Sequence, residues 1–371
     1  MSGDARRMLS RQWIAIHGGS CDVRMGPGAL SQAETMLRSS VGRPRLCMAV
    51  VPTNMDGTLR ETLARQLAAA GFAVHWHEVS REGSRNLDEA CRLAGSLGEQ
   101  GVTGDDLCCA FGNEAILSMV SHVSGSWCEG ISLVAIPEDA AAFLEGALAP
   151  QALDVGDRPC MLWVRPSVQH VLLDYDLVCG QVRDEATTYA RVLMVGAAMC
   201  ASERDFSALW DSTAELMSGD ENSFADHLVA AAKARGKILS STAAAIRQSI
   251  WYGKDFARAL GTLVGARVPE STLLAEGMRF SARLAAAEGK LSVDDMLAQD
   301  ELLDVVGAGY ASCDVDPHQL KEALRQQRFA RTNRCMLPVP FAIGRVRMMT
   351  VEDGLMLEHA SAWCEARGEY R

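Results

Sequence analysis

A nine-residue segment that begins at Trp251, WYGKDFARA, holds the densest set of residues that could do chemistry. It places Lys254, Asp255 and Arg258 within five positions. Two cations can stabilise a developing negative charge, and a neighbouring carboxylate can move a proton. The aromatic rings of Trp251 and Tyr252 either pack in the interior or stack on a planar ligand. The segment indicates an anion-binding or acid–base site, with a structural ion-pair network as the alternative.

The composition narrows the class of protein to which this site belongs. A chain of 371 residues, 48% hydrophobic and 22% charged, is typical of a globular protein with two domains. A net charge of −11 and a pI near 5.3 argue against binding to nucleic acid, which requires clustered cations. No apolar run reaches the length of a membrane span, and the first residues, MSGDARRMLSRQW, lack the apolar core of a signal peptide. We therefore expect no membrane partner and a cytoplasmic location.

The twelve cysteines are scattered along the chain, without a Cys-x-x-Cys pair. Cys108 and Cys109 lie in an apolar, strand-like run. This distribution is typical of reduced, buried thiols, so no disulfide framework is expected.

The first half of the chain alternates apolar runs with amphipathic stretches. This alternation predicts a parallel sheet with helical crossovers, a Rossmann-like α/β domain over residues 1–175. Strands are expected at 45–51, 72–79, 106–111 and 131–136, and helices at 58–70, at 87–99 and in the stretch that ends at Ser126.

The second half, residues 176–371, has helical spacing from Glu185 to about Arg328 and is predicted to be a mainly helical domain. Breaks are expected near Gly219, Gly236, Gly265 and Gly289. Extended structure is expected at 334–349 and a last helix at 353–366.

Several phrases in this two-domain order resemble the dehydroquinate synthases and the wider sugar phosphate cyclase family. GMRFSARLAAAEGKLS (277–292) is similar to the family's GMxxAARLSxxLGLLS, and MLPVPFAIGRV (336–346) to its FVLPxxIGxAV. EGSRNL (82–87) resembles ExxKSL with Arg85 in place of lysine, and VLLDYDLV (171–178) resembles VLIDxDxL. The resemblance implies the family's fold, with an α/β domain, a helical domain and a ligand cleft between them.

The resemblance also implies use of NAD and of zinc or cobalt, but the motifs for NAD are absent. Where the family has GGGVVGD after a strand, this chain has Gly112 followed by NEAILS, which places Glu114 where pyrophosphate would lie. The family's PTTLLAQVDSSVGGK corresponds to PEDAAAFLEGALAPQ (137–151), which retains only the proline. We therefore expect no NAD, and a local capping role for Glu114.

The metal ligands implied by the resemblance are also replaced. They fall at Arg191, Lys254 and Glu270, and the acid–base histidine falls at Arg258. A guanidinium has no lone pair to give to a metal, so no metal is expected. The charges of the first three residues sum to +1, and we expect a salt-bridged cluster in place of the ion. Arg247 matches a family arginine that precedes NFGHTFGHA and could retain affinity for an anion.

Two functions remain open from the sequence. The first is a repurposed enzyme of secondary metabolism that uses acid–base chemistry without a cofactor on a small anionic or carbonyl-bearing intermediate, by cyclisation, dehydration or isomerisation. Its catalytic residues would be Lys254, Arg258, Glu270 and Asp255, with Arg191, Arg247, Tyr252 and His122 binding substrate. The second is a pseudoenzyme that acts as a partner or scaffold of another biosynthetic enzyme. A homodimer is expected in both cases.

Overall fold

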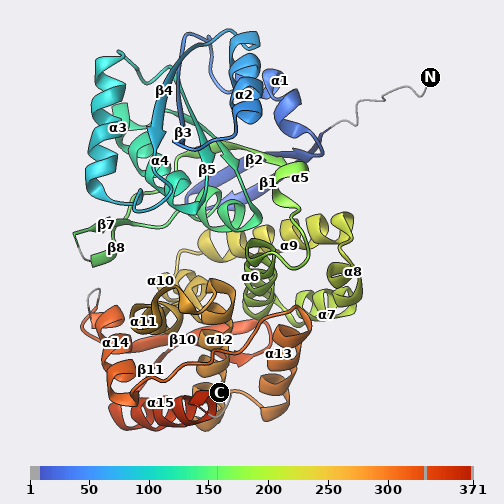
Figure 1. The fold of residues 1–371 in the computed structure, drawn as a ribbon, viewed down its shortest axis with the longest axis vertical. Helices are drawn as coiled ribbons and strands as arrows, with labels where there is room; N and C mark the ends of the chain where they lie inside the picture. The colour runs from blue at the N-terminus through green and yellow to red at the C-terminus, as the bar shows by residue number, and fades with distance from the viewer. Residues whose placement is uncertain (1–8, 157, 330–331, 369–371) are drawn as a thin grey trace. The chain divides into compact units, whose positions relative to one another are not determined.

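The computed structural model describes residues 9–156, 158–329 and 332–368, and the chain divides into two compact units that meet in sequence between Gly180 and Gln181. Figure 1 shows the helices and strands of each unit. Within the described residues, no helix combines the length and the apolar character needed to cross a membrane.

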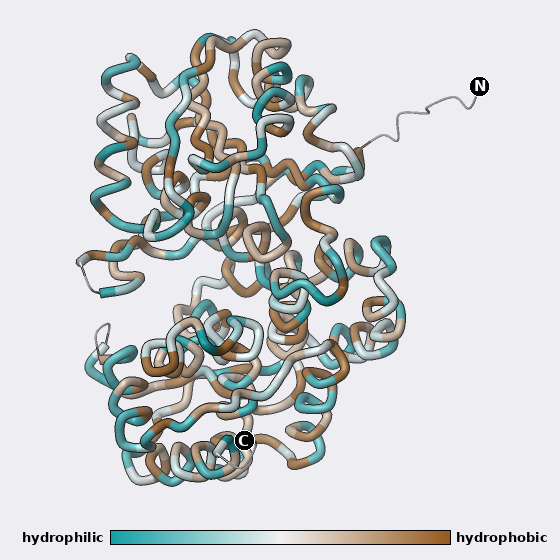
Figure 2. The backbone as a smooth tube through the Cα atoms, viewed as in Figure 1, coloured by the Kyte–Doolittle hydropathy of each residue, from teal (hydrophilic) through white to brown (hydrophobic). Residues whose placement is uncertain are grey.

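The first unit is built on a seven-stranded sheet. Its strands lie in the order β1 (Ser10–Ile16), β2 (Gly19–Gly26), β9 (Val168–Asp174), β6 (Ser132–Pro137), β5 (Leu107–Gly112), β3 (Leu46–Pro52) and β4 (Ala73–Val79). The β1–β2 pair is antiparallel and all the other pairs are parallel. The inner strands β6, β5 and β3 are almost fully buried, as expected of a sheet covered on both faces. Most of their residues are apolar (Figure 2).

Most helices of this unit begin at a polar side chain that caps them. They are α1 (Glu34–Ser39), α2 (Gly57–Ala69), α3 (Leu87–Glu99), α4 (Glu114–Ser126) and α5 (Tyr175–Val178). Asp56, Asn86 and Asn113 accept the backbone N–H groups of Leu59, Glu89 and Ile116, so α2, α3 and α4 each start at an N-cap. A π-helix (Ala142–Ala147) and the hairpin of β7 (Leu153–Val155) and β8 (Arg158–Leu162) complete the unit.

The second unit is mainly helical. It contains α6 (Glu185–Ala201), α7 (Glu203–Asp211), α8 (Thr213–Ser218), α9 (Glu221–Leu239), α10 (Ala244–Arg247), α11 (Lys254–Val264), α12 (Glu270–Ala287), α13 (Val293–Val305), α14 (Pro317–Phe329) and α15 (Asp353–Gly368). The antiparallel strands β10 (Met336–Ala342) and β11 (Arg345–Thr350) add a hairpin. The expected fold, a Rossmann-like α/β domain followed by a mainly helical one, is confirmed.

Helix α12 is buried over most of its length and forms the centre of the second unit. Glu276 in this helix has no exposed surface, and its carboxylate accepts hydrogen bonds from Trp363 (2.7 Å) and Arg367 (2.8 Å). A buried carboxylate requires such partners, and here they attach the last helix, α15, to α12.

Two features differ from the expectations. A break was expected near Gly236, but α9 continues past this buried glycine and ends three residues later, at Leu239. Strands β1 and β2 were not predicted, since their exposed positions interrupt the apolar alternation.

Candidate functional site

Two glycines position Lys254. Gly253, directly before Lys254, has a φ of 80°, a conformation that glycine adopts without steric cost, and α11 begins after it. A Cβ atom at Gly277 in α12 would lie 1.9 Å from the carbonyl oxygen of Gly253. The loop can therefore lie against α12 only because residue 277 has no side chain, and this contact fixes the start of α11.

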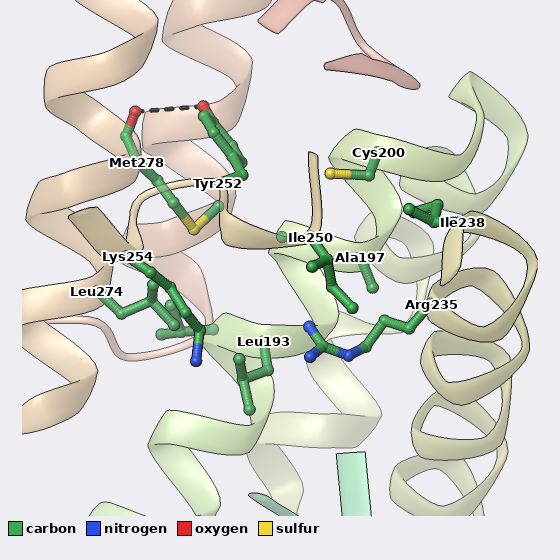
Figure 3. A pocket seen from close by; sticks show the side chains of 12 residues that line it. Leu193, Ala197, Cys200, Arg235, Ile238, Ile250, Tyr252, Lys254, Leu274 and Met278 are labelled. Carbon is green, nitrogen blue, oxygen red and sulfur yellow. Dashed lines mark hydrogen bonds between the residues drawn. The ribbon is translucent and has the colours of Figure 1, made fainter. Parts of the chain in front are cut away.

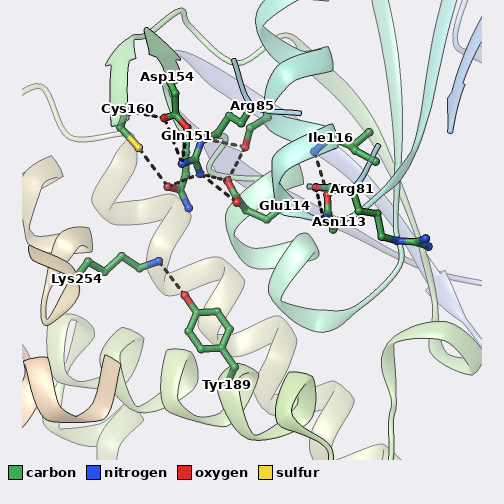
Figure 4. Close-up of polar contacts among 11 residues, drawn as sticks. Arg81, Arg85, Asn113, Glu114, Ile116, Gln151, Asp154, Cys160, Tyr189 and Lys254 are labelled. Carbon is green, nitrogen blue, oxygen red and sulfur yellow. Dashed lines mark hydrogen bonds and ion pairs between the residues drawn. The ribbon is translucent and has the colours of Figure 1, made fainter. Parts of the chain in front are cut away.

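Lys254 is directed into the second unit, with only 8% of its surface exposed. Its ammonium nitrogen donates a hydrogen bond to the hydroxyl oxygen of Tyr189 at 3.3 Å and lies 5.8 Å from the centre of the Tyr189 ring (Figure 4). The hydroxyl of a tyrosine can accept a hydrogen bond from an ammonium, and it can also donate its own proton to another group. Lys254 and Tyr189 thus form a pair with the functional groups of an acid–base site.

Lys254 also lines a pocket between α6, α9, α11 and α12. The pocket is apolar over most of its wall, which includes Leu193, Ile250 and Met278, and its other charged lining residue is Arg235 in α9. Figure 3 shows the ammonium of Lys254 and the guanidinium of Arg235 directed toward Leu193 from opposite sides. An apolar wall with a few convergent polar groups is typical of a small-molecule site.

Two polar side chains at the back of the pocket belong to the structural framework. Burial raises the pKa of the Cys200 thiol to about 12, so this group remains protonated near neutral pH. The hydroxyl of Tyr252 bonds to the carbonyl oxygen of Met278 (3.2 Å) and to Gln299, and burial raises its pKa well above the ordinary value. Tyr252 therefore lines the pocket with its hydroxyl bonded to the protein.

Arg191 is only two residues from Tyr189, but it projects from the opposite face of α6. Successive residues of an α-helix are rotated by about 100°, so Tyr189 and Leu193 share a face and Arg191 does not. Its guanidinium donates to the carbonyl oxygen of Val182 (2.7 Å) and to the hydroxyl of Thr188 (3.1 Å), and burial lowers its pKa. The structure does not bring Arg191 to the pocket that Lys254 lines.

Glu270 is exposed at the first residue of α12. The carboxylate of Glu185 accepts the N–H group of Ser271 at 2.7 Å and caps this helix. A carboxylate at a helix N-terminus is favoured by the helix dipole, so Glu185 and Glu270 both have a local stabilising role here.

Asp255 and Arg258 point to different partners. Asp255 is 3% exposed and accepts a hydrogen bond at 3.1 Å from Arg328 of α14, which is also buried. The guanidinium of Arg258 lies over the ring of Trp251, 4.5 Å from its centre. The buried ion pair supports the structural interpretation for Asp255.

The last two predicted binding residues, Arg247 and His122, lie in different units. Arg247 donates to the carbonyl oxygens of Ser241 (2.7 Å) and Thr242 (2.9 Å), and so closes the loop between α9 and α10. His122 is half-buried in α4, where burial lowers its pKa.

The three residues at the family's ligand positions do not fit a divalent metal. Arg191 and Lys254 are cations with different hydrogen-bond partners, Val182 and Tyr189. Glu270 is the one carboxylate among the three. Within the described part of the chain, no group of three or more histidine, cysteine, aspartate or glutamate side chains could hold a metal ion. A tetrahedral site needs three or four such donors around the ion.

The turn before α4, where the family binds pyrophosphate, carries its own ion pair. Glu114 lies in the first turn of α4, and its carboxylate accepts two hydrogen bonds from Arg85, at 3.0 and 3.2 Å (Figure 4). Arg85 also bonds to Gln151 (3.0 Å) and lies 3.4 Å from Asp154. A dinucleotide phosphate would meet two carboxylates at this point, so the residues do not fit NAD.

Two residues beside Lys254 were not predicted from the sequence: Tyr189, which bonds to it, and Arg235, which lines the same pocket. Tyr189 is 65 positions from Lys254 in the sequence, and Arg235 lies in a helix whose other cations are exposed. Helical spacing of Tyr189, Leu193 and Gly196 was the available signal, because it places Tyr189 on the face that packs inward.

Comparisons with known proteins bear on the family and the fold. No family model matches the chain. The chain is 25% identical over 325 residues to a 3-dehydroquinate synthase of Saccharopolyspora erythraea, covering 84% of this chain and 83% of that protein. It is 21% identical over 347 residues to a 3-dehydroquinate synthase of an Arthrobacter species, covering 91% and 92%.

Two solved structures are similar over almost the whole chain. A 2-deoxy-scyllo-inosose synthase complexed with carbaglucose-6-phosphate, NAD+ and Co2+ has a TM-score of 0.83 at 14% identity, with 95% of this chain and 99% of that chain covered. ValA, a 2-epi-5-epi-valiolone synthase from Streptomyces hygroscopicus subsp. jinggangensis with NAD+ and Zn2+ bound, has a TM-score of 0.79 at 15% identity, with the same coverage. At these identities the structural likeness establishes the fold.

Proposed function

Because the chain is a divergent member of the dehydroquinate synthase / sugar phosphate cyclase family, we propose that it is a repurposed biosynthetic enzyme that works without NAD or a metal ion. It would catalyse a cyclisation, dehydration or isomerisation of a small intermediate of secondary metabolism by acid–base chemistry. The named relatives are synthases of cyclic products, and this supports the proposal that the chain catalyses a reaction of a related class.

The observation that carries this proposal is the hydrogen bond between Lys254 and Tyr189 at the wall of a pocket that also contains Arg235. In the proposed reaction, Arg235 binds an anionic group of the substrate, and Lys254 with Tyr189 moves a proton or stabilises an enolate. Apolar walls exclude water and strengthen these interactions.

The other predicted catalytic residues take supporting roles in this proposal. Arg258 adds positive charge to the start of α11, where it stacks on Trp251. Asp255 holds α11 to α14 through Arg328. Glu270 lies at the exposed N-terminus of α12, where its carboxylate interacts favourably with the helix dipole.

The proposal is tested by incubating the purified chain with a metabolite extract of the producing cells and comparing the mixture by mass spectrometry. We expect one metabolite to be consumed and an isomer or a dehydrated product to form. The Lys254→Ala variant should convert the metabolite at least about 100-fold more slowly, because a positioned acid or base usually contributes a factor of this size. Lys290→Ala, which changes an exposed lysine outside the pocket, is the control and should match the wild type.

A second candidate function, a non-catalytic partner or scaffold, is favoured by the contacts of Asp255 and Glu270. Asp255 forms an ion pair with the buried Arg328, and Glu270 lies at the surface. The Lys254→Ala/Arg258→Ala double variant separates the two functions. If the variant folds and the pathway product still forms at a normal yield, the enzyme proposal is wrong; if the purified wild-type chain converts an intermediate, the scaffold proposal is wrong.

A further inference from the structure

The pocket of the second unit combines one amine with one guanidinium. The empty space around it, open solvent included, amounts to about 320 Å3, and Lys254 and Arg235 are the charged residues among the described side chains that line it. Both are buried, with 8% and 7% of their surfaces exposed. No carboxylate side chain is among the lining residues that the structure describes. A ligand with an anionic group and a compact, partly apolar body would complement this pocket.

We propose that Lys254 is a nucleophile that condenses with the ketone or aldehyde group of a small anionic compound to form an imine, while Arg235 binds the anionic group. This inference rests on the proposed function and names its substrate class, an oxo acid or a phosphorylated carbonyl compound. It replaces simple proton transfer by covalent catalysis at the same lysine.

The reaction is balanced without any oxidant or reductant. The Lys254 ammonium first loses a proton to solvent, which frees the lone pair of the neutral amine. That lone pair forms a bond to the carbonyl carbon, and the π electrons of the carbonyl bond move to its oxygen. That oxygen takes a proton, the nitrogen loses one, and a neutral carbinolamine results. Protonation of its hydroxyl group and loss of one water molecule then give the protonated imine.

Tyr189 is placed to carry the protons of these steps. Its hydroxyl oxygen lies 3.3 Å from the nitrogen of Lys254. In the proposed reaction it exchanges protons with the attacking amine and with the departing hydroxyl group. The protonated imine withdraws electrons from the neighbouring carbon, which makes a proton on that carbon removable. The imine thus supplies the polarisation that a metal ion provides to a carbonyl group in other enzymes.

The composition of the chain gives independent support to a specific use of the amine. Of the 36 lysines and arginines, five are lysine: Lys233, Lys237, Lys254, Lys290 and Lys321. Arginine is the usual cation in this chain, and it also serves the buried ion pairs of Arg328 and Arg367. A guanidinium remains protonated and does not form an imine, so lysine at position 254 retains a reactivity that arginine lacks.

The experiment is reductive trapping with pyruvate and sodium cyanoborohydride at neutral pH, followed by intact-mass measurement and peptide mapping. We expect one reduced pyruvate adduct per chain, mapped to Lys254. Lys254→Arg, which keeps the charge, should lose the adduct, and Lys290→Arg should keep it. Peptide mapping of the wild type identifies the modified lysine even if Lys254→Arg does not fold.

A second comparison tests the role of Arg235. Acetone has the ketone group of pyruvate without the carboxylate, and Arg235→Gln removes the charge that is proposed to bind it. We expect Arg235→Gln to slow trapping of pyruvate about tenfold, the effect of one lost charge-assisted hydrogen bond, and to leave acetone unaffected. Equal slowing of both probes would contradict an anion-binding role for Arg235.

The outcomes separate the imine from the proposed function. No adduct on the folded wild type, or adducts distributed evenly over the five lysines, overturns the imine. If the extract is still converted in a Lys254-dependent manner while trapping fails, the imine alone is wrong. If trapping at Lys254 succeeds but no metabolite is converted, the imine site is supported and the proposed biosynthetic function is wrong.

Discussion

Arg85 donates hydrogen bonds to both carboxylate oxygens of Glu114, at 3.0 and 3.2 Å, directly at the N-terminus of α4. The N-terminal end of such a helix after a strand is where a Rossmann-like fold binds pyrophosphate. Here the same position holds a carboxylate of the chain together with the cation that neutralises it. Both partners of this ion pair belong to the first unit.

We expect the chain to show no saturable NAD binding up to about 1 mM, because two carboxylates near Arg85 oppose a phosphate. Isothermal titration or NADH fluorescence measures this binding, and a dissociation constant in the micromolar range would contradict the prediction.

Glu114→Gln should lower the free energy of unfolding by about 1–3 kcal/mol, since Arg85 then lacks the negative charge of its partner. Glu99→Gln, an exposed glutamate at the end of α3, is the control.

We expect purified protein to contain zinc or cobalt far below one ion per chain, because Arg191 and Lys254 cannot coordinate either metal. Elemental analysis by mass spectrometry checks this. Conversion in the metabolite extract should be unchanged after treatment with EDTA. A stoichiometric metal, or loss of turnover that zinc restores, would show that other residues form a site.

Replacing Gly277 by alanine should destabilise the second unit by about 1–3 kcal/mol or more, because the new Cβ would lie 1.9 Å from the carbonyl oxygen of Gly253. Movement of that loop should also displace Lys254 and slow its trapping. Gly95→Ala in α3 is the matched control, since nothing lies within 4 Å of its added Cβ. This control should be stabilised by about 0.5–1 kcal/mol, the usual gain in a helix. Urea denaturation measures both variants.

Asp255→Asn should reduce the free energy of unfolding by about 3–5 kcal/mol, because it leaves Arg328 buried without its counter-charge. Asp255→Asn/Arg328→Met should recover much of this loss, since no uncompensated charge remains. If Asp255 is structural, the double variant keeps full conversion of the metabolite. A folded double variant without activity would instead favour a direct role for Asp255 in the reaction.

Stability should fall as the pH decreases below about 6.5, the ordinary pKa of histidine. Burial lowers the pKa of His122, so the folded state favours the neutral ring, while the unfolded state takes up a proton. The stabilising contribution is therefore present above the unfolded pKa and is lost as the pH falls toward the folded one. Urea midpoints between pH 5 and 8 should depend less on pH in His122→Gln, whereas His318→Gln, at an exposed position, should behave as the wild type.

Much of the fold follows from local patterns in the sequence. The helix expected at 87–99 matches α3, since Asn86 caps its start and apolar residues recur along one face. The strand expected at 106–111 matches β5 within one residue, because a continuous apolar run is typical of a buried parallel strand. Such features depend on neighbouring residues, so the sequence alone predicts them.

The site depends on contacts between distant residues, and only the tertiary structure decided them. The sequence placed Lys254 and Arg191 at matching family positions, but the rotation of α6 is set by its packing. That rotation directs Tyr189 toward Lys254 and turns Arg191 to the other face. Likewise, Arg235 lines the pocket of Lys254 because α9 packs against α6. The residue types limit which reactions are possible, and the packing of the helices determines which side chains come into contact.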